Sequence, residues 1–177
     1  MLPEINLANI TALAFLLAGA GYLYICAITF FTTAKSKQRR DYFSVGICLA
    51  LFSIFYGLMT VASDETLIRI FWACGFIPSY IFPVRWIQFV SNMVTFKRDR
   101  LIKITINIAL VIAVVISLLC VLYGDTVFVQ TQFGNQFSYQ NSLIFKVACA
   151  YTTLMIIAFM ILHIKWWRDS ETKRQKV

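Results

Sequence analysis

One arginine, Arg85, stands inside an apolar stretch of sequence, 65–93, that is long enough to cross a membrane as a helix. At about 1.5 Å per residue, a helix from Arg69 to Lys97 would be about 42 Å long, so we expect Arg85 near the middle of the bilayer. A guanidinium at that depth costs at least about 2.5 kcal/mol unless water, a carbonyl group or an anion meets it. The sequence therefore predicts an inward-facing partner for Arg85.

Other polar residues share the helix face that carries this arginine. Pro78, Arg85 and Asn92 are spaced by sevens, and Gln88 lies one turn from Arg85. Two prolines, Pro78 and Pro83, each remove a backbone donor, so we predict a kink in this helix. We interpret the polar face as part of a pocket for an anionic or amphipathic ligand. The residues expected to line this pocket are Arg85, Gln88, Trp86, Tyr80 and Lys146. In the alternative interpretation, Arg85 bonds only to carbonyl groups freed by the prolines and simply stabilises the bundle.

The residue types that catalysis needs are not grouped in this sequence. All eight carboxylates fall in predicted loops or at the ends of apolar segments. The single histidine, His163, lies beside the basic and aromatic run that begins at Lys165, where we expect an interfacial role. The five cysteines lack the short C-x-x-C spacing of metal and redox sites. We therefore predict no enzyme activity, no metal site and no cofactor.

The composition predicts an integral membrane protein. Hydrophobic residues make up 60% of the chain and aromatic residues 16%, and the mean hydropathy is +0.75. A soluble domain is only about half apolar. The apolar segments form five predicted spans, at 5–33, 43–62, 65–93, 101–123 and 141–164. The formal charge of +8 is concentrated between these segments, which argues against a nucleic-acid partner.

The basic residues predict how the spans are oriented. The boundaries after the first, third and fifth spans, with Lys103 at the start of the fourth span included, carry thirteen of the sixteen Lys and Arg residues. By the positive-inside rule these regions are cytoplasmic. We therefore predict an all-α bundle of five spans, with its N-terminus outside, its C-terminus in the cytoplasm and a kinked third helix.

The loop between the fourth and fifth spans has a different pattern. In 126–140, aromatic and β-branched residues alternate with Gln, Thr and Ser, and Gly134-Asn135 is a two-residue turn signal. This pattern predicts a short extracytoplasmic hairpin. We divide the chain into a membrane bundle, 1–168, and a helical cytoplasmic tail, 169–177, that could lead to a downstream region.

The third span also carries a motif. Phe71-Trp72-Ala73 is followed by Pro83-x-x-Trp86-x-x-Phe89 and then by a basic turn. In this respect the chain resembles the N-terminal membrane region of bacterial seven-helix sensor histidine kinases. The resemblance implies a sensory module in which ligand binding moves a helix and so controls a cytoplasmic kinase or cyclase. It also implies that His163 is not a phosphoacceptor, because no kinase domain accompanies it.

Two functions from different classes follow from these observations. The first is a sensory input module in the bacterial cytoplasmic membrane, with membrane lipids and a small ligand as partners and a homodimer as one option. The second is a small anion transporter or channel component, in which the third helix lines a path and Arg85 selects anions. The reading frame beyond Val177 and anion flux in proteoliposomes would discriminate between them.

Overall fold

The computed structural model describes residues 6–33, 35–94, 96, 99–139 and 142–174, with the backbone alone for 170–174. Within these residues, five helices are long and apolar enough to cross a membrane. They are α1 (Leu7–Thr32), α2 (Lys37–Val61), α3 (Glu65–Ser91), α4 (Asp99–Tyr123) and α5 (Leu143–Arg174). The prediction of a five-helix bundle is confirmed. Most helix ends lie within two residues of the expected span ends, but α2 begins six residues earlier than expected and α5 continues ten residues further.

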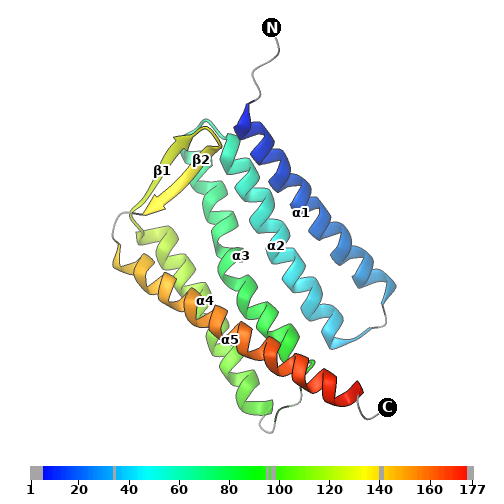
Figure 1. The fold of residues 1–177 in the computed structure, drawn as a ribbon. Coiled ribbons are helices and arrows are strands. Elements are labelled where there is room, and N and C mark those ends of the chain that lie inside the picture. The colour runs from blue at the N-terminus through cyan, green and yellow to red at the C-terminus, as the bar shows by residue number, and fades with distance from the viewer. Residues whose placement is uncertain (1–5, 34, 95, 97–98, 140–141, 175–177) are drawn as a thin grey trace.

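The helices are arranged with α3 at the centre. Helix α1 packs mainly on α2, α2 packs on α3, and α4 and α5 cover the other side of α3 (Figure 1). Helices α2 and α5 flank α3 and do not form a substantial interface with each other. The N-terminal end of α1 lies near the β-strands, and α5 ends at the opposite end of the bundle (Figure 1).

Local sequence explains where the helices begin. The side chains of Asn6, Ser36 and Asp64 each accept a hydrogen bond from a backbone N–H of the first turn of α1, α2 and α3, respectively. These residues are typical N-caps, since they satisfy donors that have no partner within the helix. Helix α3 continues through Pro78 and Pro83 to Ser91 without interruption, and the predicted kink stays a prediction.

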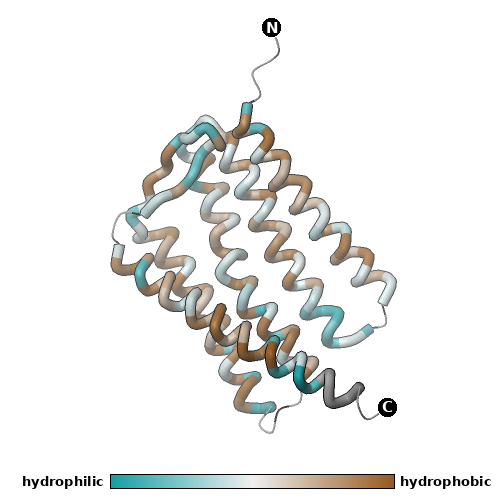
Figure 2. The backbone as a smooth tube through the Cα atoms, in the orientation of Figure 1, coloured by the Kyte–Doolittle hydropathy of each residue, from teal (hydrophilic) through white to brown (hydrophobic). Residues whose placement is uncertain are grey.

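The predicted hairpin is present between α4 and α5. Strands β1 (Thr126–Thr131) and β2 (Gly134–Tyr139) pair antiparallel, with Thr131 opposite Gly134 at the turn. Polar residues gather at this hairpin and at the other end of the bundle, and apolar residues dominate the helices between them (Figure 2). This distribution is the one a membrane-spanning bundle needs.

Two clusters of buried side chains hold α3 against its neighbours. The first lies below the hairpin and joins α2, α3, α4 and α5 around Trp72, Phe76 and Phe145. The second lies further along the same helices, around Val84, Ile106 and Tyr151. Tyr80 packs against both clusters, so it stands at their boundary.

Candidate functional site

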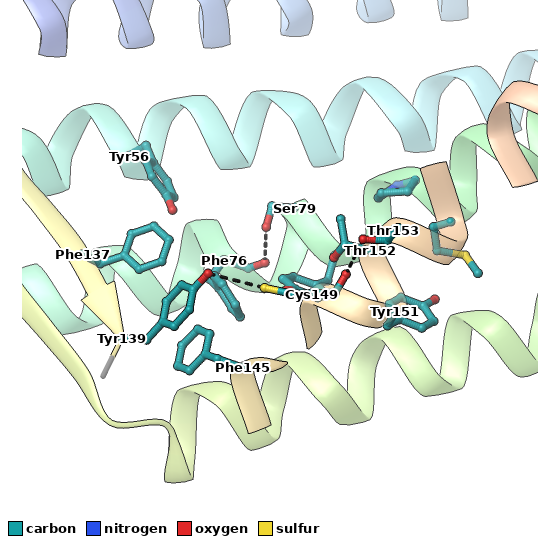
Figure 3. A pocket seen from close by; sticks show the side chains of 13 residues that line it. Tyr56, Phe76, Ser79, Phe137, Tyr139, Phe145, Cys149, Tyr151, Thr152 and Thr153 are labelled. Carbon is teal, nitrogen blue, oxygen red and sulfur yellow. Dashed lines mark hydrogen bonds between the residues drawn. The ribbon is translucent and has the colours of Figure 1, made fainter. Parts of the chain in front are cut away.

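A cavity of about 430 Å³ lies beside α3, between α2, α5 and β2. Seven of its thirteen lining residues are aromatic, and none of the thirteen is Asp, Glu, Lys, Arg or His. Figure 3 shows aromatic side chains from β2, α2, α3 and α5 meeting around it. The lining residues are Tyr56, Phe76, Ser79, Tyr80, Pro83, Phe137, Tyr139, Phe145, Cys149, Tyr151, Thr152, Thr153 and Met155.

Neutral hydroxyl and thiol groups supply the polarity of this cavity. Tyr139 on β2 and Cys149 on α5 are linked by a hydrogen bond of 3.4 Å between the phenol oxygen and Sγ (Figure 3). The contact with Cys149 raises the pKa of Tyr139, so its phenol is neutral at physiological pH. Ser79 Oγ donates to the carbonyl oxygen of Phe76, one turn earlier in α3. The cavity therefore offers aromatic faces and uncharged hydrogen-bonding groups.

The hairpin covers one end of the cavity because the start of β2 is attached to the end of α2. Asn135 Nδ2 donates to the carbonyl oxygens of Met59 and Ala62, at 2.9 and 2.6 Å. These carbonyls belong to the last turn of α2 and its C-cap, where no N–H four residues later continues the helix. Within the helix end, the Met59 carbonyl accepts from the N–H of Ala62 at 3.3 Å. Gly134 has φ +98°, and a Cβ there would overlap Thr60. The chain reverses at Gln132 and Phe133, two residues before the predicted turn. Gly134 and Asn135 instead begin β2 and attach the hairpin to the bundle.

Arg85 does not line this cavity and instead belongs to a polar network between α2 and α3. Its Nη1 donates to Gln88 Oε1 at 2.9 Å, and Gln88 Nε2 donates to Asp41 Oδ1 at 3.0 Å. Asn92 Nδ2 donates to Asp41 Oδ2 at 2.6 Å, and Lys37 Nζ donates to Asn92 Oδ1 at 3.0 Å. The network joins two cations to one carboxylate through two amides.

Arg85 lies nearer to the end of its helix than the sequence-based expectation placed it. Glu65 begins α3 twenty residues earlier and Ser91 ends it six residues later, so Arg85 is only about 9 Å from the end of the helix. With every carboxylate expected in a loop or at the end of a span, the sequence offers Arg85 no buried anion. The structure provides one, since Asp41 is only 8% exposed and lies within electrostatic reach of Arg85. Asp41 lies in the second turn of α2, which begins before the span expected from residue 43.

Trp86 forms a third site, between α3 and α5. Its Nε1 donates to His163 Nε2 at 3.3 Å, and the two rings are nearly parallel. The ring of Trp86 also contacts Phe89 and Phe159. From the sequence, His163 was expected at the membrane interface, and no partner was predicted for it. Nothing in a linear sequence relates this histidine to a tryptophan 77 residues away.

The five residues predicted to share a ligand pocket are thus divided among different places. Tyr80 lines the cavity, Arg85 and Gln88 lie in the α2–α3 network, and Trp86 contacts His163. The side chain of Lys146 is exposed in the first turn of α5. Their shared ligand role remains a prediction. In the described part of the chain, no group of three or more His, Cys, Asp or Glu side chains could hold a metal ion.

The family model for the N-terminal 7TM region of histidine kinase matches residues 9–177. The chain belongs to this family. No curated protein and no solved structure matches it. As an N-terminal 7TM region of histidine kinase, the chain is a membrane protein of the sensor class, and the resemblance indicated by its third span is confirmed.

The aromatic and proline residues that carry the resemblance pack α3 against three neighbouring elements. Trp72 is 3% exposed and packs below the hairpin, where its ring contacts Phe128 and Phe137, whereas Phe71 stacks on Phe55. Further along α3, the motif residues are Pro83 in the cavity wall, Trp86 at His163 and Phe89 against Tyr42. The motif therefore fixes α3 against the hairpin, α5 and α2.

Proposed function

We propose that this chain is the input module of a membrane sensor, and that it binds an uncharged, partly apolar ligand in the cavity beside α3. The observation that carries the proposal is the lining itself, a cavity of about 430 Å³ with seven aromatic residues and no formally charged side chain. Ligand pockets are typically apolar with a few polar groups that fix orientation. Here the phenols of Tyr56, Tyr80 and Tyr139 and the hydroxyls of α5 would serve that purpose.

The absence of charge in the lining favours a neutral ligand over an anionic one. Arg85 donates to Gln88 in the network with Asp41, and the exposed Lys146 is not a lining residue. An anion in this cavity would lose its hydration without meeting a cation. Since α2 and α5 do not close against each other, the cavity is also suited to a ligand that arrives from the lipid.

The proposed orientation puts the hairpin outside the cell and the end of α5 in the bacterial cytoplasm. Thirteen of sixteen basic residues belong to the three regions at the end of the bundle away from the hairpin. Cytoplasmic loops carry such an excess of Lys and Arg. This orientation places the covered end of the cavity on the side from which an extracellular or membrane-borne signal would come.

Movement of α5 would carry the signal. The cavity wall includes α3 residues from Phe76 to Pro83 and α5 residues from Phe145 to Met155, so a ligand would contact both helices. Helix α5 continues unbroken to Arg174, well beyond the cavity. Small shifts of packed helices are a common way to transmit a binding event, because a packed core switches between discrete arrangements.

The experiment is a ligand screen by thermal unfolding of the purified chain in detergent micelles. A panel of uncharged amphiphiles and an equal panel of carboxylates and phosphates are compared. A true ligand at 100 times its Kd should stabilise the folded state by about 2.7 kcal/mol. Ser79→Phe, which fills the cavity, should abolish the shift, and Tyr80→Phe should reduce it while leaving the fold intact. Arg85→Ala is the control and should retain the shift.

Two results would refute this proposal. If only anions stabilised the chain and Arg85→Ala abolished this effect, the ligand would bind at Arg85 and not in the uncharged cavity. A shift that survives in Ser79→Phe would show that the ligand binds elsewhere. Anion flux through the wild-type chain in proteoliposomes would favour the transporter function instead.

A further inference from the structure

The contact between Trp86 and His163 is a direct hydrogen bond between side chains of α3 and α5. Trp86 Nε1 carries a hydrogen and can only donate, so His163 Nε2 must be the acceptor at 3.3 Å. An imidazole nitrogen accepts only when it carries no hydrogen. The bond therefore requires that Nε2 be unprotonated.

The second nitrogen of the imidazole fixes the tautomer. His163 Nδ1 lies 2.9 Å from the carbonyl oxygen of Phe159, one turn earlier in α5. A carbonyl oxygen can only accept, so Nδ1 carries the hydrogen. With one nitrogen donating to Phe159 and the other accepting from Trp86, the structure selects the neutral imidazole with hydrogen on Nδ1. A second proton on Nε2 would face the indole N–H, donor against donor.

The surroundings of this contact are aromatic and cationic. The centroid of the imidazole lies 4.0 Å from that of the Phe159 ring. The Trp166 ring packs against the imidazole in a T-shaped arrangement. Arg85, the charged residue next to Trp86 on α3, donates to Gln88, and Lys165 Nζ on α5 lies over the Phe96 ring. The other charged residues that α4 and α5 bring to this end, among those described, are Asp99, Arg100, Lys103, Arg168 and Asp169. Cations outnumber carboxylates here, so an imidazolium would add to existing positive charge.

We propose that His163 is a proton-binding site that gives this module a second input, the pH at the end of the bundle away from the hairpin. Imidazole is the side chain whose charge changes in the physiological range. At high pH the neutral ring joins α5 to α3. As the pH falls, protonation of Nε2 breaks the bond to Trp86, and repulsion from Lys165 and the neighbouring cations favours separation of the two helices. The site stands at the beginning of the segment by which α5 leaves the bundle, after the cavity and independent of it.

Two substitutions separate titration from packing. His163→Gln keeps an acceptor oxygen that can reach the indole N–H, but it does not titrate. His163→Phe keeps a ring against Phe159 and Trp166 but offers no acceptor. Trp72 lies near the hairpin and provides an internal reference, because its ring contacts Phe76, Phe128 and Phe137 and is far along α3 from Trp86.

The experiment follows the indole N–H signals of tryptophan in the full chain, labelled with ¹⁵N and held in lipid nanodiscs, from about pH 8.5 to about pH 5. Signals are assigned with Trp86→Phe and Trp166→Phe. The wild-type Trp86 and Trp166 signals should move together along one single-site curve, whereas the Trp72 signal stays fixed. In His163→Gln both should be independent of pH. In His163→Phe the Trp86 signal should keep the wild-type low-pH position throughout.

Three results would overturn the proposal. In the first, the wild-type Trp86 and Trp166 signals do not change with pH. In the second, the titration curve persists in His163→Gln. In the third, the Trp72 signal moves with the same midpoint as the other two, which would indicate a global transition. Because no cavity ligand is present in this titration, its outcome is independent of whether the ligand screen succeeds.

Discussion

At the scale of single residues, the buried carboxylate of Asp41 decides how the cations of α2 and α3 are accommodated. Asp41→Ala would remove the acceptor of Gln88 Nε2 and one of the two acceptors of Asn92 Nδ2, which also donates to the carbonyl oxygen of Gln88. Arg85 would lose its nearby anion. We expect a loss of about 2–4 kcal/mol in the free energy of unfolding. Asp125→Ala, the same change at an exposed position, should stay within about 0.5 kcal/mol. Chemical denaturation in micelles measures both, and equal losses would contradict a special role for Asp41.

Residue types alone predicted part of this chemistry. The stripe formed by Arg85, Gln88 and Asn92 follows from helical spacing, and two of these three residues do bond directly to Asp41. The carboxylate itself could not be found in the same way, because its partners lie 47 and 51 residues later on another helix. Similarly, the neutral cavity combines single residues from α2, α3, β2 and α5, and no short motif records that combination.

At the scale of elements, the hairpin depends on one backbone conformation. Gly134 has φ +98°, and a Cβ at this position would overlap Thr60 of α2. We expect Gly134→Ala to cost at least about 1–2 kcal/mol from the backbone alone and to loosen the hairpin from α2. Thermal unfolding should show the loss, and proteolysis of the hairpin should become faster.

A second glycine provides the matched control for this change. In α1, a Cβ at Gly21 would meet no atom within 4 Å, and alanine is the better helix former by up to about 1 kcal/mol. Gly21→Ala should therefore preserve or raise the stability. If Gly134→Ala behaved like Gly21→Ala, the turn would not be what attaches the hairpin to α2.

Elements were easier to predict than their contacts. Long apolar runs separated by basic turns predict where the helices lie, because hydrophobic length acts locally. The start of α2 was missed, since Ser36 caps it within the basic turn and the apolar run begins only near residue 43. The hairpin was predictable from the local alternating pattern of 126–140, but its turn lies at Gln132-Phe133 and not at the expected Gly134-Asn135. That Asn135 would bond to the last carbonyls of α2 was not predictable, since those groups belong to a helix more than 70 residues earlier.

At the scale of the whole molecule, the order of helices around α3 explains why the cavity exists. Helices α2 and α5 both pack on α3 but do not close on each other, and the hairpin covers the space between them at one end. On α3, Pro83 lines the cavity, and Trp86, about one turn later, bonds to His163 of α5. A ligand that displaces the α3 wall would therefore act close to the contact that holds α5.

The orientation of the bundle can be tested with two single cysteines at opposite ends. Gln132 is exposed in the hairpin turn, and Lys35 is exposed in the basic turn between α1 and α2. Because the positive-inside rule puts the basic turn in the cytoplasm, a membrane-impermeant maleimide should label Gln132→Cys on intact spheroplasts and Lys35→Cys only after permeabilisation. The wild-type chain controls for labelling of Cys149, which is exposed on α5. The reverse pattern would place α5 and its continuation outside the cell, where movement of α5 could not reach a cytoplasmic kinase.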